Sequence, residues 1–308
     1  MFQLKHKVLF SSIGLIALVV LLAPVCFADV NGAPHLGMGS GARSLGLGGA
    51  FTAVANDATS TIWNPAGLPA VNDLTITLSS APMSHDRRHS FIGLIKRVGN
   101  GGLGLSVINA GVDDIDSYNK AGIRTGSFNQ NSNAFALSYG HHLGVVNLGV
   151  SGRFYMDTFG DHSDTSGFAG ADVGLLGANR ARTFSYGLAG RNLGNSIPGL
   201  EVPIIVAGGL AYRVLHKHVA TFSVDVQHQI VDLPESTTSL HLGTEYLIAK
   251  TFAIRGGSKL TTDRVQFFAG FGVNVGGLQL DYAVKAIESA VYDDIGGGTH
   301  FVSLSYSY

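Results

Sequence analysis

The chain has few charged residues and a single cysteine. Of its 308 residues, 13% are Asp, Glu, Lys or Arg, and the formal net charge is −1. A charge this close to zero argues against a nucleic acid or another polyanion as partner. The one cysteine, Cys26, lies in a segment that we expect to be removed, so the mature chain has no internal disulfide, thiol chemistry or cysteine metal site.

Long apolar runs are absent after residue 28, although 45% of the chain is hydrophobic. No later stretch reaches the roughly 20 apolar residues that a membrane-spanning helix needs. In lipid, only helices and closed β-barrels satisfy every backbone hydrogen-bonding group. A hydrophobic, exported chain of this kind therefore favours an all-β fold, a transmembrane antiparallel β-barrel in contact with outer-membrane lipid.

Residues 1–28 have the layout of a secretory signal peptide. A basic region around Lys5 and Lys7 precedes an apolar stretch of about 15 residues and a cleavage region that ends at Ala28. Val25 stands where a lipoprotein signal needs a small residue, so we expect no lipid on Cys26. We predict an N-terminal periplasmic segment with a hatch over residues 29–72 and the barrel over residues 73–308.

Apolar and polar residues alternate along much of residues 73–308. Leu74, Ile76 and Leu78 alternate with Thr75 and Thr77, for example. A period of two places one set of side chains in lipid and the other in a lumen. The pattern predicts about 14 strands, near residues 73–80, 89–97, 102–110, 132–140, 145–156, 167–177, 180–192, 202–213, 217–228, 239–248, 250–258, 264–275, 277–285 and 299–308.

The predicted links between strands alternate between long and short. Gly111–Asn131 is the longest, Asp157–Ser166 is another long one, and Gly276–Gly277 is typical of the short turns. Outer-membrane barrels have long loops outside and short turns in the periplasm. The last strand alternates and ends on the aromatic Tyr308, a feature similar to the signal by which barrel-assembly machinery recognises its clients.

The stretch from Gly41 to Leu68 precedes the strands and differs from them. Its first half is rich in glycine, which permits close backbone contact and positive φ. Asn56 and Asp57 are candidates to cap a short helical turn that ends near Trp63. Asn64 followed by Pro65 predicts a second N-cap with proline at the first helical position, and Gly67 is expected to end that turn.

This stretch reads GAR-x-L-G-x-G-G-A-F, then A-x-x-N-D-A, then W-N-P-A-G-L, and it resembles the N-terminal signature of PorV/PorQ-type outer-membrane proteins. These proteins are relatives of the FadL fatty acid transporter fold. The resemblance extends to residues 184–193, 278–284 and 299–308. It implies a small hatch inside a barrel of about 14 strands, in the outer membrane of a Gram-negative-type bacterium.

Eight charged residues fall at inward-facing positions of the predicted strands, four of each sign. An arginine that faced lipid at the midplane would cost roughly 2–4 kcal/mol, so we expect these charges to pair inside the barrel or to hold the hatch. One interpretation is a salt-bridged lumen that stiffens the wall. The other is a substrate path along these groups. The residues are Arg153, Asp172, Arg191, Arg213, Asp225, Glu245, Arg255 and Asp281.

Motifs for catalysis or for metal and cofactor binding are missing. No serine lies in a nucleophile-elbow pattern. Asp113, Asp114 and Asp116 are potential calcium ligands in a long loop, but they lack the glycine and terminal glutamate of an EF-hand. We therefore expect a protein without enzymatic activity, catalytic residues, metal or cofactor.

Two classes of function stay open. By analogy with FadL, a hydrophobic compound would pass through a pocket beside the hatch, lined or gated by Phe51, Ile62, Trp63 and Leu68, with Asn64, Pro65 and Gly67 setting the turn. Simple packing of these side chains against the lumen wall is the alternative. The second class is an interaction protein: PorV-like members serve type IX secretion and hand a secreted protein to surface attachment, and Gly111–Asn131 is the longest candidate loop for that binding.

Overall fold

A computed structural model describes residues 34–160, 163–194, 196–197, 202–215, 218–231, 236–262, 264–286 and 298–308. The expected signal peptide and residues 29–33 lie outside the described residues. Among the residues that the model describes, no helix is long and apolar enough to cross a membrane.

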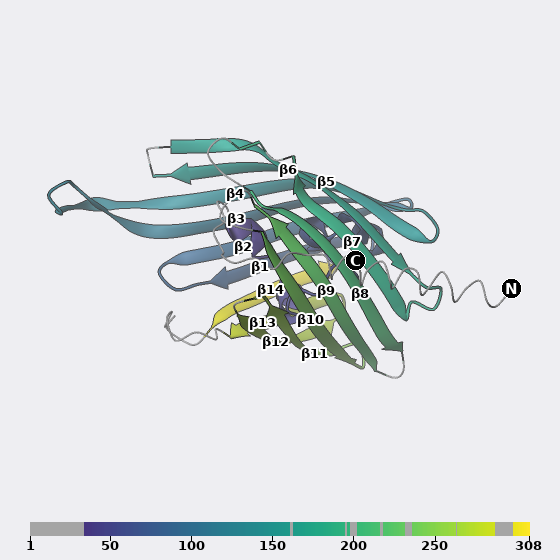
Figure 1. Cartoon of the computed structure of the whole chain (residues 1–308). Coiled ribbons are helices and arrows are strands. Elements are labelled where there is room, and N and C mark those ends of the chain that lie inside the picture. Colours follow the sequence, from purple (N-terminus) through teal and green to yellow (C-terminus); the bar gives the residue numbers. More distant parts are fainter. Residues whose placement is uncertain are drawn as a thin grey trace.

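Fourteen antiparallel strands close into one barrel, in which β1 pairs with both β2 and β14 (Figure 1). The prediction of an all-β, 14-stranded antiparallel barrel is confirmed. The strands are β1 Leu74–Pro82, β2 Arg87–Val98, β3 Gly101–Tyr118, β4 Arg124–His142, β5 Val146–Phe159, β6 Ser163–Ala178, β7 Phe184–Leu193, β8 Ile204–Leu215, β9 Val219–Ile230, β10 Thr237–Ile248, β11 Phe252–Leu260, β12 Val265–Val275, β13 Leu278–Ala286 and β14 Thr299–Ser307.

Alternation along each strand separates an apolar exterior from a buried interior. On β1, Ile76 and Leu78 are exposed on the outside, whereas Thr75 and Thr77 are buried. Leu137 on β4, 60% exposed, lies on the same outer surface. An outward apolar band is what a barrel in a bilayer needs.

The predicted long loop Gly111–Asn131 is wrong, because most of it is strand. β3 and β4 pair as far as Tyr118 and Arg124, so only residues 119–123 form the loop. The pairing tolerates the Asp- and Asn-rich sequence through two register shifts, and the hairpin projects beyond the other strands as a tongue (Figure 1). The predicted link Asp157–Ser166 is shorter too, because β5 reaches Phe159 and β6 begins at Ser163.

Residues 34–72 precede β1 and lie inside the barrel; we call them the lumenal segment. It contains α2 Pro34–Gly37, α3 Ala42–Gly46, α4 Ser60–Trp63 and the 3-10 helix η1 Pro65–Ala70. α3 packs on β11–β14 and η1 on β2–β6, so the segment contacts opposite sides of the wall. Most of its residues from 38 to 71 are buried.

Two details of the lumenal segment differ from the predictions. Thr59, rather than Asn56 or Asp57, occupies the N-cap of α4, and Asp57 instead accepts hydrogen bonds from the backbone and hydroxyl of Thr59. Gly67 does not end η1, which continues to Ala70. Its missing side chain serves close packing, because a Cβ there would lie 2.4 Å from the carbonyl oxygen of Ala55.

Candidate functional site

Asn64 fastens the lumenal segment to the barrel wall. Its Oδ1 accepts from the Ala66 backbone at 3.1 Å and so caps η1, while its Nδ2 donates to the carbonyl oxygens of Thr52 at 2.9 Å and Leu175 at 3.2 Å. Leu175 belongs to β6, so one fully buried amide joins two parts of the segment to the wall. The sequence predicted the cap but not the bond to the wall.

Two wall glycines make room for this turn. A Cβ on Gly174 of β6 would lie 2.1 Å from Asn64 Oδ1, and a Cβ on Gly149 of β5 would lie 2.2 Å from the carbonyl carbon of Pro65. Neither distance is compatible with a side chain. Strand glycines of this kind mark a close approach of another backbone, and that is the signal in the sequence that could have found them.

Trp63 lies at the centre of an apolar cluster. Phe51 contacts it edge-on, with ring centroids 6.2 Å apart, and the Arg191 guanidinium lies 5.5 Å from its ring centre. Its Nε1 donates to the carbonyl oxygen of Ser40 at 3.0 Å. Ile62 is also buried in the cluster. All seven predicted pocket and turn residues are buried: Phe51, Ile62, Trp63, Asn64, Pro65, Gly67 and Leu68.

The apolar cluster continues from Trp63 into the half of the lumen nearer the long loops. Inward side chains of four strands belong to the same cluster: Phe91, Ile108, Tyr155 and Phe301. Phe91, Tyr155 and Phe301 lie toward the loop ends of their strands, and Ile108 is the cross-strand partner of Phe91. Large apolar groups of this half therefore reach the lumenal segment, alongside the buried polar side chains of His89 and Ser132.

Arginines from two strands bind the carbonyl oxygen of Ile62, the residue before Trp63. Arg153 on β5 donates to it at 3.3 Å and Arg191 on β7 at 3.5 Å. Arg153 also pairs with Asp172 at 2.6 Å. The end of α4 is therefore held by charged groups from the wall.

The wall beside Asp172 is irregular. The pairing of β6 with β7 shifts register between Ala171 and Val173, and Gly170 and Asn192 both have positive φ there. The Asn192 backbone donates to Asp172 at 2.9 Å. β7 ends at Leu193. Beyond this break, Ser196 lies next to β6, and its backbone donates to the carbonyl oxygen of Phe168. The alternating pattern of the sequence did not predict this break.

A second charged network fixes α3 at the other end of the lumenal segment. Arg43 donates to both carboxylate oxygens of Glu245, at 3.0 and 3.2 Å, and to Asn56 at 2.6 Å and Asp57 at 3.1 Å. Glu245 also accepts from Arg255 at 2.7 Å. Because Glu245 lies between two guanidinium groups, it joins the segment to β10 and β11 through charge-assisted hydrogen bonds.

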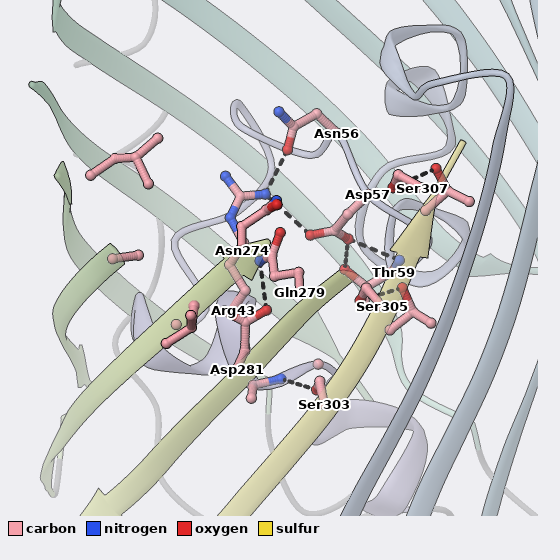
Figure 2. Close-up of a pocket in the computed structure, with 18 of the residues that line it drawn as sticks. Arg43, Asn56, Asp57, Thr59, Asn274, Gln279, Asp281, Ser303, Ser305 and Ser307 are labelled. Atoms are coloured by element: carbon pink, nitrogen blue, oxygen red, sulfur yellow. Dashed lines mark hydrogen bonds and ion pairs between the residues drawn. The ribbon is translucent and has the colours of Figure 1, made fainter. Parts of the chain in front are cut away.

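A polar cavity of about 340 Å³ lies beside this network, toward the short turns. Its lining includes Arg43 and Asp57 of the lumenal segment and, on the neighbouring strands β13 and β14, Asp281, Ser303, Ser305 and Ser307 (Figure 2). Asp281 pairs with Arg255 and accepts from Gln279 at 2.6 Å. The seven predicted pocket residues do not line this cavity.

All eight predicted lumen charges lie on inward-facing positions of their strands. Seven of them are buried, and Arg213, near the turn end of β8, is half-buried. Ion pairs join Arg153 to Asp172 and Arg255 to both Glu245 and Asp281. Asp225 instead accepts from the Thr52 backbone at 2.7 Å, another contact with the lumenal segment. These charges fasten the segment to the wall.

The three candidate calcium ligands of the tongue do not converge. Asp113 pairs with Arg88, and Asp116 pairs with Arg124 at 2.6 Å. Asp114 has a positive φ. The hydrogen bond from Arg124 holds the pKa of the Asp116 carboxyl below its usual range. Within the described ranges, no group of three or more His, Cys, Asp or Glu residues could hold a metal ion.

Comparison with solved structures identifies proteins of the same architecture. The toluene transporter TodX of Pseudomonas putida superposes with a TM-score of 0.60 at 13% identity over 88% of this chain and 99% of that one. The CymD monoaromatic hydrocarbon channel gives 0.62 at 11% identity, over 88% and 98%. A Pseudomonas aeruginosa FadL homologue gives 0.61 at 11% identity, over 87% and 98%.

No family model matches the chain, and a sequence search of curated proteins gives no match. Identities of 11–13% establish architecture only. The chain therefore has the fold of the FadL-type barrels.

Proposed function

We propose that the chain is an outer-membrane channel of the PorV/PorQ (FadL-like) type, in a Gram-negative-type bacterium, that passes hydrophobic compounds. The supporting observation is the apolar cluster that runs from Phe91 and Ile108 in the loop half of the lumen to Phe51 and Trp63 in the lumenal segment. Small-molecule sites are mainly apolar with a few placed polar groups. Arg191 beside Trp63 is such a group.

The cargo class follows from the contrast between the two halves of the interior. An apolar compound that enters from the loops meets this apolar cluster before it reaches Trp63, whereas the cavity on the turn side is lined by hydroxyls and paired charges. Burial of apolar surface favours the first region by about 25 cal/mol per Å². The break between β6 and β7 lies beside the Arg153 contact with α4 and offers a side exit when that contact opens.

Tryptophan fluorescence tests this proposal, because Trp63 is the only tryptophan of the chain. We expect monoaromatic hydrocarbons or medium-chain alkanes, added to the mature protein in detergent, to change its emission with a saturable dependence on concentration. Polar compounds of the same size should have no effect. Uptake of the same labelled hydrocarbon by cells that produce the protein should rise above that of cells without it.

A pair of lumen variants serves as matched test and control. Ile108→Asn places an amide in the apolar cluster, where it is removed from water and has no hydrogen-bond partner. The variant should therefore weaken both binding and uptake of the hydrocarbon. Thr77→Asn introduces the same group on the wall of the polar cavity and should leave both unchanged. Equal behaviour of the two variants, or no saturable response in the native protein, would contradict the proposal.

The tongue favours a second function, that of a secretion-associated interaction protein similar to a type IX secretion shuttle. β3 and β4 continue past the neighbouring strands, and their exposed tip includes Tyr118 and Ile123 (Figure 1). Exposed apolar side chains on a projecting hairpin suit contact with a secreted protein. Loss of cargo attachment after shortening of the tongue, with hydrocarbon binding intact, would favour this function.

A further inference from the structure

Two cations occupy turn positions where the backbone favours glycine. Arg182 in the β6–β7 turn and Lys250 in the β10–β11 turn have φ of 54° and 61°. A side chain in this left-handed region costs free energy, and glycine or asparagine is the usual choice. At the same end of the barrel, the β2–β3 and β12–β13 turns use Gly99 and Gly276 at φ of 57° and 60°. Both positions therefore carry a cation where glycine is usual, and the uncharged Ala249 beside Lys250 also has a positive φ, of 50°.

These cations belong to a sector of the rim without acidic residues. Residues 177–185, 213–220 and 247–253, which span the β6–β7, β8–β9 and β10–β11 turns, contain no Asp or Glu. Arg180 and Arg213 add positive charge to the sector. Arg180, Arg182 and Lys250 are exposed, and no ion pair engages them within the described part of the chain. Lys250 also borders the polar cavity.

Hydrogen bonds between neighbouring turns make this sector one surface. The Arg213 backbone donates to the carbonyl oxygen of Thr183 at 2.6 Å, and the Ala249 backbone donates to His218 Nδ1 at 3.3 Å. Within the β6–β7 turn, Asn179 Oδ1 accepts from the backbone of Thr183 at 2.9 Å. These bonds join the backbones of the turns that carry the cations.

Aromatic side chains lie on the outer wall directly next to these turns. Phe184 and Tyr212 are cross-strand partners on β7 and β8, and both are exposed on the outside. Tyr246 and Phe252 are exposed on β10 and β11, and the Tyr246 ring lies 5.9 Å from that of His218. Aromatic rings mark the membrane interface, and cations just beyond them lie at the level of lipid phosphates.

We propose that the β6–β7, β8–β9 and β10–β11 turns bind anionic phospholipid of the periplasmic leaflet, with Arg182 and Lys250 each contacting a lipid phosphate and the outer aromatic rings against the acyl chains. The inference rests on the membrane placement given above but not on the cargo. The three turns carry cations and no acidic residue, which suits an anionic headgroup. The aromatic side chains on the adjacent outer wall favour a lipid over an acidic protein.

Native mass spectrometry of the detergent-purified mature protein tests this site. With equal amounts of dioleoyl phosphatidylglycerol and dioleoyl phosphatidylcholine, we expect preferential adducts of the first lipid. Arg182→Gly combined with Lys250→Gly should weaken that preference roughly fivefold for each cation removed. Because glycine relieves the positive φ, the variant should melt at or above the native temperature, which separates lost binding from misfolding.

Lys96→Gln combined with Arg97→Gln is the matched control. It removes two exposed cations at the same end of the barrel, outside the three turns, of which Lys96 is paired with Asp73, and should keep the lipid preference. Equal loss in both variants, or no loss in either, would overturn the site. If millimolar inorganic phosphate displaced the lipid, the surface would be assigned to a free anion. If polyglutamate bound with the same dependence on Arg182 and Lys250, it would be assigned to an acidic protein. Either result would overturn the lipid assignment. Neither result bears on the change of Trp63 emission with hydrocarbon, which tests the proposed function separately.

Discussion

At the scale of single residues, Gly174 and Gly149 determine how closely the lumenal segment approaches the wall. We predict that Gly174→Ala lowers the free energy of unfolding by about 1–3 kcal/mol, because the new methyl group meets Asn64 Oδ1 and overpacks the interior. Urea unfolding of the protein reconstituted in lipid vesicles measures the change. Gly152→Ala is the control, since its Cβ would have Phe168 at 4.0 Å as its only neighbour within that distance. Equal stability of the two variants would show that the contact is loose.

Asn64 supports a second prediction at this scale. Asn64→Ala removes the cap of η1 and the bonds to Thr52 and Leu175, and should cost about 1–3 kcal/mol because buried backbone carbonyls lose their donor. Trp63 emission should move to longer wavelength as its neighbour loosens. Asn119→Ala, in the exposed tip of the tongue, removes an amide that also caps a turn and should leave the emission unchanged.

Residue-scale features were predictable where they depend on near neighbours in the chain. The Asn64–Pro65 cap and the inward parity of the charges follow from local spacing and from the period of two. The facing of Gly174 and Asn64, 110 positions apart, depends on strand register and could not be read from the sequence. The pairing of Arg43 with Glu245 was missed for the same reason.

At the scale of elements, α3 depends on one carboxylate. Glu245→Gln leaves the guanidinium groups of Arg43 and Arg255 without the charge between them, and we expect amide hydrogens of α3 to exchange about tenfold faster or more, since hydrogen bonds to charged groups contribute about 1.5–3 kcal/mol. Exchange in α4 should change little, because Arg153 and Arg191 hold it separately.

Arg213→Gln is the control for this prediction. It removes a charge from the same inward set, but Arg213 takes part in none of the ion pairs described for the lumen. If both variants released α3 to the same extent, general electrostatics of the lumen rather than the Glu245 contacts would hold the helix.

Strands were predicted more accurately than their extensions. Alternating apolar residues identify the part of each strand that has an apolar outer face, so all fourteen were located. The tongue has no such requirement, and its Asp113, Asp114 and Asp116 gave the composition of a loop, although the strands pair on both sides of the register shift that contains Asp113 and Asp114. The break between β6 and β7 was missed because it depends on Asn192 adopting positive φ, which alternation does not report.

At the scale of the whole molecule, the proposed membrane placement requires the exterior of the barrel to match a bilayer. Leu137 and its cross-strand partner Leu105 lie on the outer face of β4 and β3, both more than half exposed. Leu137→Arg should lower the free energy of unfolding by about 2–4 kcal/mol in lipid vesicles, because the guanidinium would face hydrocarbon. The same substitution at Tyr118, exposed near the tip of the tongue, should change it by about 0.5 kcal/mol or less, as at most surface positions. Short-chain detergent has no thick hydrocarbon layer. The two variants should therefore differ less in their free energy of unfolding in this detergent than in lipid vesicles. A cost at Leu137 no larger than at Tyr118 would mean that this band does not lie in lipid, and both the channel and the phospholipid site would then lose their physical basis.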